Sequence, residues 1–582
     1  MDPPAQASKT GAASPTVVLE GVGCCRGDCK EGVARFLGLP YALPPVGSLR
    51  WKPPEPPEPF SGVRANPEVL SRCPQPSFGH SNPDEERPRV TFEGHRLEDN
   101  EDCLVLNVFA PEASVTSADS GHACELTPVV FYIHGGGGKF GSCHGPHLTG
   151  QKLVQSQSVC YVAANYRLGI FGFLAHPELS AEDLSSEGEV LASGNYALLD
   201  LTAALKWVRR HISSFGGDPH NVTVWGFSTG AQLAGCLLVS PVAQGLFHRM
   251  FIQSCVDLVN SRALESGSNV WLDKSAEAWG QNLAEILGCS QGKGQVAAMR
   301  KLSAVHIANH TMVKHATDCY EPALDTRLCE GKVSARPCLS STAIDTGAFN
   351  KVPLMIGVTE QDGLGKSELE LTQFEEIDVK TLAGLDALLE REFSEAKEAK
   401  QHYPIYPSAR PVSKHVYLEQ FLGDLSKDLW YNAATWHFAN TLADKSSPTY
   451  LYVFTEKVSS SGLSWEPDIS TFPSSFHGSD AVYWNGTRLL QPCPVESNTK
   501  DLIECMMTYL GNFARTGNPN SLAPSKLPTW EAHTCGSMRY MELGPRLGMQ
   551  ILDQQSQRRN EFIERYFNKQ LMTERLAKRR KT

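Results

Sequence analysis

The 582-residue sequence lacks several features that mark particular protein classes. It has no uninterrupted run of eighteen apolar residues, so no membrane-spanning helix is expected. Its net charge of −11 argues against a broad nucleic-acid-binding face, which needs clustered Lys and Arg. The opening stretch MDPPAQASKTGAASPT has no charged head followed by an apolar run, so no signal peptide is predicted. We therefore expect a cytoplasmic protein, and a secreted one only if this N-terminus is misread.

The cysteines do not form the paired clusters of a structural zinc site. There are 17 of them, an odd number, and most of their spacings are irregular. Cys24, Cys25 and Cys29 in CCRGDC resemble half of a zinc site, but no matching second cluster follows. We expect no metal and mostly reduced, partly buried thiols, because disulfides persist in oxidising compartments.

The chain reads as one large domain with distinct ends. Residues 1–15 are small and polar with prolines, which predicts disorder. Residues 16–570 contain no convincing linker or repeat and are predicted to form a single domain. The stretch 369–400 is predicted to be helical and charged on one side, either as a solvated face or as part of a lid. Residues 571–582 form a basic tail, which we interpret as solvated rather than as a nuclear address.

Strand-like and helix-like segments alternate through the middle of the chain. Residues 128–134 and 158–166 are short and rich in β-formers, which is typical of buried strands. Residues 197–215 carry apolar side chains at helical spacing. After a Gly- and Pro-containing break, a strand is predicted at 222–226 and a helix at 229–240. This order predicts the α/β class, with a mostly parallel central sheet and helices on both faces.

The stretch VTVWGFSTGAQLAG, residues 222–235, contains the pattern Gly-x-Ser-x-Gly between a predicted strand and a predicted helix. Gly226, Ser228 and Gly230 fit a nucleophile elbow, a tight turn that holds a serine hydroxyl above the sheet. A short glycine-containing match can also be an ordinary turn. A second motif, HGGGGKFGS at 134–142, follows a predicted strand and fits an oxyanion loop, whose structural alternative is a flexible turn.

Longer motifs carry a resemblance to a known family. They are FLGLPYALPPVGSLRWKPPEP, NEDCLVLNVFAP, VVFYIHGGGG, NYRLGIFGFL and the segment from GNYALLD to GFSTGA. In this order they resemble the type-B carboxylesterase/lipase family over residues 17 to 570. The resemblance implies the α/β-hydrolase fold, a serine esterase acting on a small-molecule ester, and no cofactor. It implies nothing about oligomeric state.

The family's Ser, acid and His are carried over motif by motif. The nucleophile maps to Ser228. The acid motif resembles PLMIGVTEQDG, where Asp362 stands in the position that is usually Glu, and Glu360 two residues earlier is the alternative. The histidine motif resembles SSFHGSD and gives His477. A lone His beside a glycine would otherwise be interpreted as a turn residue.

The resemblance also implies residues around this set. Backbone N–H groups of Gly136, Gly137 and Thr229 would form the oxyanion hole. Cys73 and Cys103 stand where the family forms its first disulfide, which conflicts with the reduced thiols expected above.

Two residues of the elbow depart from the family pattern. Phe227 replaces the usual Glu or Gln and cannot supply the charge that supports a cationic substrate. Thr229 replaces Ala, and its β-branched side chain predicts a narrower acyl site or an altered geometry, and so a lower activity. No tryptophan lies between Cys73 and Cys103, where cholinesterases carry one that meets the choline. We therefore expect hydrolysis of neutral, fairly apolar esters. The alternatives are an inactive adhesion-type homologue, as in the neuroligins, and an acyltransferase that uses the same acyl-enzyme.

Overall fold

The structure is a computed structural model, and most of the α/β core is described. The described residues are 14–75, 91–119, 125–145, 149–185, 190–255, 262–263, 275–289, 292–310, 323–324, 333–334, 347–362, 398, 401–402, 424–425, 427–443, 445, 447–457, 475–487, 497–520 and 526–565. The predicted disorder of 1–15, the predicted helix at 369–400 and the basic tail 571–582 fall wholly or almost wholly outside them.

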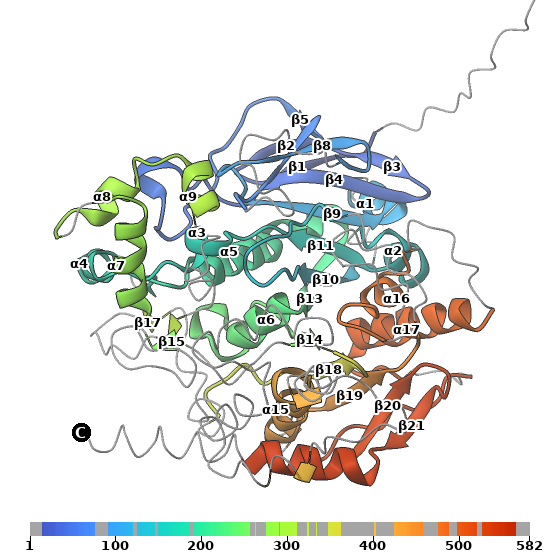
Figure 1. The fold of residues 1–582 in the computed structure, drawn as a ribbon. Coiled ribbons are helices and arrows are strands. Elements are labelled where there is room, and N and C mark those ends of the chain that lie inside the picture. The colour runs from blue at the N-terminus through green and yellow to red at the C-terminus, as the bar shows by residue number, and fades with distance from the viewer. Residues whose placement is uncertain are drawn as a thin grey trace, which may run out of the picture.

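One sheet dominates the described residues, with the order β21-β20-β19-β18-β14-β13-β10-β11-β9-β4-β3. Neighbouring strands from β20 to β11 run parallel, and the strands beyond them at both edges pair antiparallel. Figure 1 shows these strands following one another from the blue N-terminal edge to the red C-terminal edge. Their bounds are β3 Asp28–Lys30, β4 Val33–Pro40, β9 Val105–Pro111, β10 Thr127–Ile133, β11 Cys160–Ala164, β13 Gly217–Phe227, β14 Arg249–Gln253, β18 Leu354–Thr359, β19 Thr449–Phe454, β20 Arg539–Leu543 and β21 Gly548–Ile551.

Smaller sheets lie outside this central one. They pair β1 Thr16–Leu19, β2 Gly23–Arg26 and β5 Val63–Ala65; β6 Val69–Arg72, β8 His95–Asp99 and β7 Thr91–Phe92; β12 Val190–Leu191 and β17 Val333–Ser334; and β15 Arg262–Ala263 and β16 Ala323–Leu324.

Helices cover both faces of the central sheet (Figure 1). The α-helices are α1 Glu112–Asp119, α2 Gln151–Gln157, α3 Gly169–Phe173, α4 Pro177–Ser185, α5 Tyr196–His211, α6 Thr229–Val239, α7 Ala276–Ile286, α8 Gln295–Met299, α9 Ala304–His310, α15 Ala433–Ala443, α16 Ala481–Asn485 and α17 Ser497–Thr516. Short 3₁₀ turns lie at Gly47–Leu49, Ile212–Phe215 and Pro241–Ala243, and a π-helix spans Asp428–Asn432.

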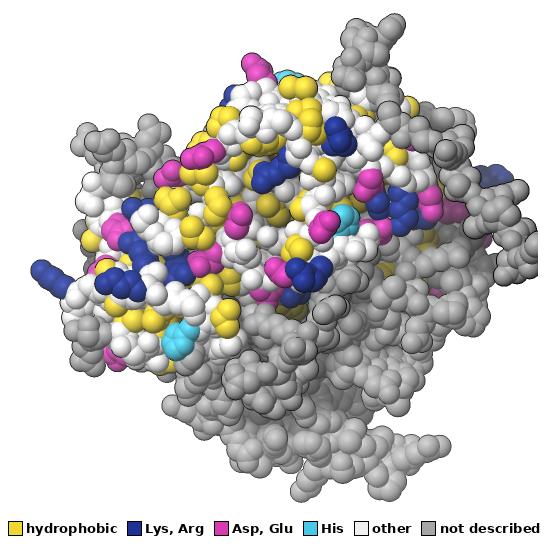
Figure 2. Space-filling model, turned by 90° about the horizontal axis from the view of Figure 1, so that it is seen from above, with side chains coloured by type: hydrophobic (Ala, Val, Ile, Leu, Met, Phe, Trp, Pro, Cys, Tyr) yellow, Lys and Arg dark blue, Asp and Glu magenta, His cyan; other side chains and the backbone are white. Residues whose placement is uncertain are grey.

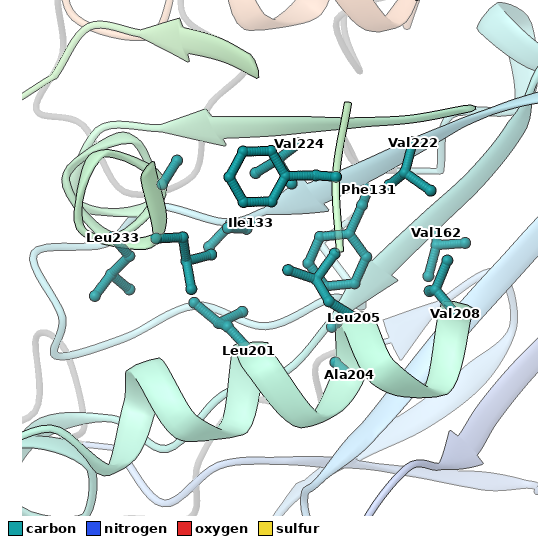
Figure 3. Close-up of a cluster of buried hydrophobic side chains, with 14 of the residues drawn as sticks. Phe131, Ile133, Val162, Leu201, Ala204, Leu205, Val208, Val222, Val224 and Leu233 are labelled. Carbon is teal, nitrogen blue, oxygen red and sulfur yellow. The ribbon is translucent and has the colours of Figure 1, made fainter. Parts of the chain in front are cut away.

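Alternation along the strands assigns side chains to two separate cores. Phe131 and Ile133 of β10 belong to the core that includes α5 and α6, whereas Tyr132 between them belongs to the core that includes α2, α16 and α17. Figure 3 shows the first core, in which strand side chains meet residues of α5 and α6 such as Leu201 and Leu233. Because both faces are covered, the central strands consist of nearly continuous apolar runs, as the sequence predicted.

The predicted elements around the elbow are confirmed, with one correction. The strands predicted at 128–134 and 158–166 and the helices predicted at 197–215 and 229–240 correspond to β10, β11, α5 with its 3₁₀ turn, and α6. The strand predicted to begin at Val222 begins at Gly217 instead. Gly217 pairs with Thr127 before an irregularity in the ladder, so the Gly- and Pro-containing stretch is part of the strand rather than a break before it.

Three further observations concern the described residues alone. None of their helices is both long and apolar enough to cross a membrane. No group of three or more His, Cys, Asp or Glu side chains among them is arranged to hold a metal ion. Figure 2 shows one face of the molecule, on which described Lys and Arg side chains are interspersed with Asp and Glu rather than gathered into one broad cationic area.

Candidate active site

Ser228 lies in the turn between β13 and α6 and has a backbone conformation that is rare for a residue with a side chain. Its φ is 55° and its ψ is −123°. Such a conformation persists only where the surrounding structure enforces it. Here the backbone N–H of Ser228 donates to the carbonyl of Gln253 at 2.9 Å, at the end of the neighbouring strand β14. The turn therefore holds Ser228 at the carboxyl ends of the parallel strands.

The two glycines of the elbow are required by close backbone contacts. A Cβ atom on Gly226 would lie 2.2 Å from the carbonyl oxygen of Gly230. A Cβ atom on Gly230 would lie 2.2 Å from the carbonyl oxygen of Ile133, at the end of β10. Both contacts are with backbone, which cannot move aside as a flexible side chain can. The sequence pattern around Ser228 is therefore a packing requirement of this turn.

The glycine loop after β10 packs directly against the elbow. A Cβ atom on Gly135 would lie 2.9 Å from the Cβ of Ser228. Gly136 and Gly137 have φ values of 116° and 62°, in the region that favours glycine. Thr229 is the first residue of α6, where backbone N–H groups have no partner within the helix. The three residues predicted to form an oxyanion hole thus belong to two segments that meet at Ser228.

Gln75 fixes the far end of this loop, and the sequence analysis missed it. Its side-chain oxygen accepts from the N–H of Gly141 at 3.1 Å, and its side-chain nitrogen donates to the Gly141 carbonyl at 3.1 Å. A Cβ on Gly141 would lie 2.6 Å from Nδ1 of His134. The amide of Gln75 therefore mimics a strand pairing. No pattern in the sequence around Gln75 indicates this contact.

His477 and Asp362 meet Ser228 in one hydrogen-bonded chain. Nε2 of His477 lies 2.9 Å from Oγ of Ser228, and Nδ1 of His477 lies 2.5 Å from Oδ1 of Asp362. The loop after β18 pairs with the loop that precedes His477: Gln361 bridges to Phe476, and the N–H of Gln361 donates to the carbonyl of Ser475 at 3.1 Å. This pairing brings together the acid and the histidine.

Asp362, and not Glu360, is the carboxylate in contact with the histidine. Asp362 is fully buried, and its Oδ2 accepts the backbone N–H of Thr359 at 3.0 Å. Burial alone would raise the pKa of Asp362, but His477 and the hydrogen bonds to the carboxylate outweigh it, so the pKa is lowered. The Glu360 side chain is exposed.

A second buried carboxylate, Asp480, supports the histidine loop. Its oxygens accept from the Gln253 side chain and from the Tyr452 hydroxyl, each at 2.8 Å. Burial raises the pKa of Asp480 to about 7. Gln253 also accepts from the Trp225 indole at 2.9 Å and, through its carbonyl, from Ser228. The network therefore links the elbow to the loop that carries the histidine.

Cys73 and Cys103 are both buried free thiols in this structure. Burial raises the pKa of each, and the two side chains hydrogen-bond to each other. The Cys73 thiol also donates to the carbonyl of Tyr166 at 3.0 Å. The two residues are neighbours, and a disulfide between them stays a prediction.

The fold and this site define an α/β hydrolase with a serine at its nucleophile elbow. Residues 13–562 match the model of the carboxylesterase family. The chain belongs to the carboxylesterase family, and its class of reaction is carboxylic ester hydrolysis.

Relatives and solved structures support the same assignment. The para-nitrobenzyl esterase of Bacillus subtilis (strain 168) is 31% identical over 518 residues, which cover 87% of this chain and 91% of that protein. The fumonisin B1 esterase of Sphingopyxis macrogoltabida is 32% identical over 426 residues, covering 73% and 68%. A solved structure of a PNB esterase aligns with a TM-score of 0.71 at 27% identity, covering 94% of this chain and 99% of that one.

Proposed function

We propose that this protein hydrolyses neutral carboxylic esters through an acyl-enzyme on Ser228. The observation that carries the proposal is the continuous chain of contacts from the Ser228 hydroxyl through His477 to the buried carboxylate of Asp362. A nucleophile, a base within hydrogen-bond reach and a third group that orients the base are the parts that covalent acyl transfer needs.

The roles follow from this geometry. Ser228 Oγ attacks the ester carbonyl while Nε2 of His477 accepts its proton. Asp362 accepts from Nδ1, which keeps Nε2 free to act as the base, and it stabilises the imidazolium that forms. His477 then protonates the departing alkoxide. Water, activated by the same imidazole, releases the acid and restores the serine.

The charge that develops on the carbonyl oxygen needs donors that are already oriented. We assign this role to the N–H groups of Gly136, Gly137 and Thr229, and the packing of Gly135 against Ser228, which brings the glycine loop against the elbow, supports the assignment. Loss of a single such donor typically costs about 10²–10³ in turnover. Thr229 carries a β-branched side chain at this point, so we expect a restricted acyl site.

The proposed substrates are uncharged esters. Phe227 occupies the position at which a Glu would place a carboxylate beside the nucleophile, and its ring stacks on His477 with centroids 5.1 Å apart. An apolar ring offers a cationic alcohol group less attraction than a carboxylate. The named relatives include enzymes for para-nitrobenzyl esters and for fumonisin B1, so membership of the family does not select one ester.

Two alternatives predict different outcomes. The function of an inactive adhesion-type homologue would not require the contacts among Ser228, His477 and Asp362, so their geometry favours an enzyme. An acyltransferase would form the same acyl-enzyme but pass it to an alcohol, and a transesterified product on adding a candidate alcohol would reveal it.

The test is hydrolysis of p-nitrophenyl esters of increasing acyl length by wild type and by Ser228→Ala. We expect saturable turnover in wild type, and a loss of at least about 10⁴-fold in the variant. We also expect the acyl group to be trapped on the peptide that contains Ser228 after rapid acid quenching. Equal rates in the two proteins would reject the proposed nucleophile, and preference for a choline ester over its uncharged isostere would reject the proposed substrate class.

A further inference from the structure

Two aromatic side chains contact the imidazole of His477. Phe227, at the end of β13, stacks on it with ring centroids 5.1 Å apart and an interplanar angle of 28°. Tyr431, in the π-helix Asp428–Asn432, approaches it with centroids 5.1 Å apart and an angle of 55°. These two residues come from segments about 200 residues apart in the sequence.

The position of the Phe227 ring depends on two glycines. A Cβ on Gly478 would lie 2.7 Å from Cζ of Phe227, and a Cβ on Gly135 would lie 3.1 Å from its Cδ1. Gly478 directly follows His477 and has a φ of +81°, which also favours glycine. The ring therefore fits between the oxyanion loop and the histidine loop, in space that neither segment fills with a side chain.

The stack restrains the imidazole in the orientation that it needs. Rotation of the ring about its Cβ–Cγ bond would carry Nε2 away from Ser228 and Nδ1 away from Asp362. It would also break the near-parallel contact with Phe227. The same contact also stabilises a positive charge on the imidazole, because the face of an aromatic ring attracts a cation within about 6 Å of its centroid. During the reaction His477 becomes such a cation.

We propose that Phe227 is a positioning residue that, with Tyr431, holds the His477 ring in its working orientation and stabilises the imidazolium. The inference rests on the proposed function, since it concerns the same histidine. The residue that departs from the family pattern would then support catalysis rather than weaken it.

Other polar and titratable groups near the imidazole also influence how activity depends on pH. Asp362, at the end of β18, lies 2.5 Å from Nδ1, and the Ser228 hydroxyl lies 2.9 Å from Nε2. Tyr431 faces the ring from the π-helix. Asp480 directly precedes α16, which follows the histidine loop, and it interacts electrostatically with Asp362. Substitution of Phe227 by another uncharged residue leaves the charges of these groups unchanged.

The experiment compares wild type with Phe227→Leu, which keeps an apolar side chain but removes the ring. The control is Phe36→Leu. Phe36 packs edge-to-face on Phe215 with centroids 4.9 Å apart and an angle of 81°, so the control removes an aromatic pair from the core without touching His477 or the network of Gln253 and Asp480.

Two readouts are measured, the pH profile of p-nitrophenyl butyrate hydrolysis and the NMR titration of ¹³C-labelled histidine, with His477 assigned by substitution. For Phe227→Leu we expect a roughly tenfold to hundredfold loss of kcat with KM little changed. We also expect the midpoint of the His477 titration and of the acidic limb to fall by ~0.4–0.7 pH unit. The control should leave the midpoint unchanged.

The outcomes separate the two proposals. A midpoint that stays in place or rises in Phe227→Leu, or an equal loss of kcat in Phe227→Leu and in the control, overturns the role of Phe227. Turnover that does not depend on Ser228 overturns the proposed function instead, and the NMR titration still decides whether Phe227 stabilises the imidazolium.

Discussion

Replacing Asp362 by Asn tests which carboxylate serves His477. The change keeps the size of the side chain and removes its charge. In the folded protein the carboxylate is fully buried and lies 2.5 Å from Nδ1 of His477. Glu360, the alternative acid, is exposed and stands two residues away. Glu360→Gln is therefore a matched control, because it makes the same chemical change in the same loop.

The magnitude follows from the charge that is removed. The positive charge of the imidazolium is spread over its ring, so its centre lies farther from the carboxylate than the 2.5 Å contact. Two unit charges about 4 Å apart attract by about 4 kcal/mol at an effective dielectric constant near 20. Each 1.36 kcal/mol corresponds to about tenfold in rate, so the loss is about a thousandfold from charge alone. An amide that donates to Nδ1 would also favour the wrong tautomer and deepen the loss.

The assay is kcat/KM for p-nitrophenyl butyrate, with thermal unfolding to verify that each variant is folded. We expect Asp362→Asn to lose about 10³–10⁴-fold and Glu360→Gln to stay near wild type. In a Ser228→Ala background, Asp362→Asn should cost little more, because the groups act as a unit. Retention of most activity by a folded Asp362→Asn protein, or a large loss in Glu360→Gln, would refute this assignment.

Two further predictions concern the fold around the site. Gly230→Ala should destabilise the protein by about 1–3 kcal/mol and abolish esterase activity, since its Cβ would lie 2.2 Å from the Ile133 carbonyl oxygen. Gly245→Ala, whose Cβ would meet no atom within 4 Å but whose φ is +74°, should lose some stability through backbone strain and stay active, and an equal loss of activity in the two variants would contradict the packing argument. Burial lowers the pKa of His144 from 6.5 to about 3, so below pH 6.5 the unfolded chain binds a proton that the folded chain does not. The free energy of unfolding of wild type should therefore fall by up to about 1.4 kcal/mol for each unit by which the pH is lowered below 6.5. The Tm of His144→Asn should rise relative to the Tm of wild type as the pH is lowered from 7.5 to 5. A Tm difference between the two proteins that does not change with pH would count against this linkage.

The elbow and its flanking elements could be predicted because their signals are local. The alternation from β-formers to helical spacing lies within single segments, and the observed strands and helices match it closely. The glycine pattern around Ser228 is also local in the sequence, but the contacts that require glycine there include a strand distant in the sequence. Only the structure shows that Gly226 and Gly230 face backbone atoms of the elbow itself and of β10.

The acid and the histidine could not be predicted from the residues alone. Asp362 and His477 are 115 positions apart, and each lies in a short loop without a distinctive pattern. Their meeting depends on the pairing of Gln361 with Ser475 and Phe476, which involves only a few backbone groups. The family resemblance supplied the two positions, whereas the preference for Asp362 over Glu360 rests on burial and contact.

Phe227 shows how a departure from a motif depends on its neighbours. In the sequence the aromatic residue is a reason to expect low activity, because it removes a polar group next to the nucleophile. In the structure its ring needs the space left by Gly478, and Gly478 directly follows the histidine on which the ring stacks. A side chain at position 478 would push the ring off the imidazole, so the two residues are coupled although they lie 251 positions apart in the printed sequence. The effect of the residue at the second position of the elbow on the catalytic histidine therefore depends on whether the histidine loop leaves space for its side chain.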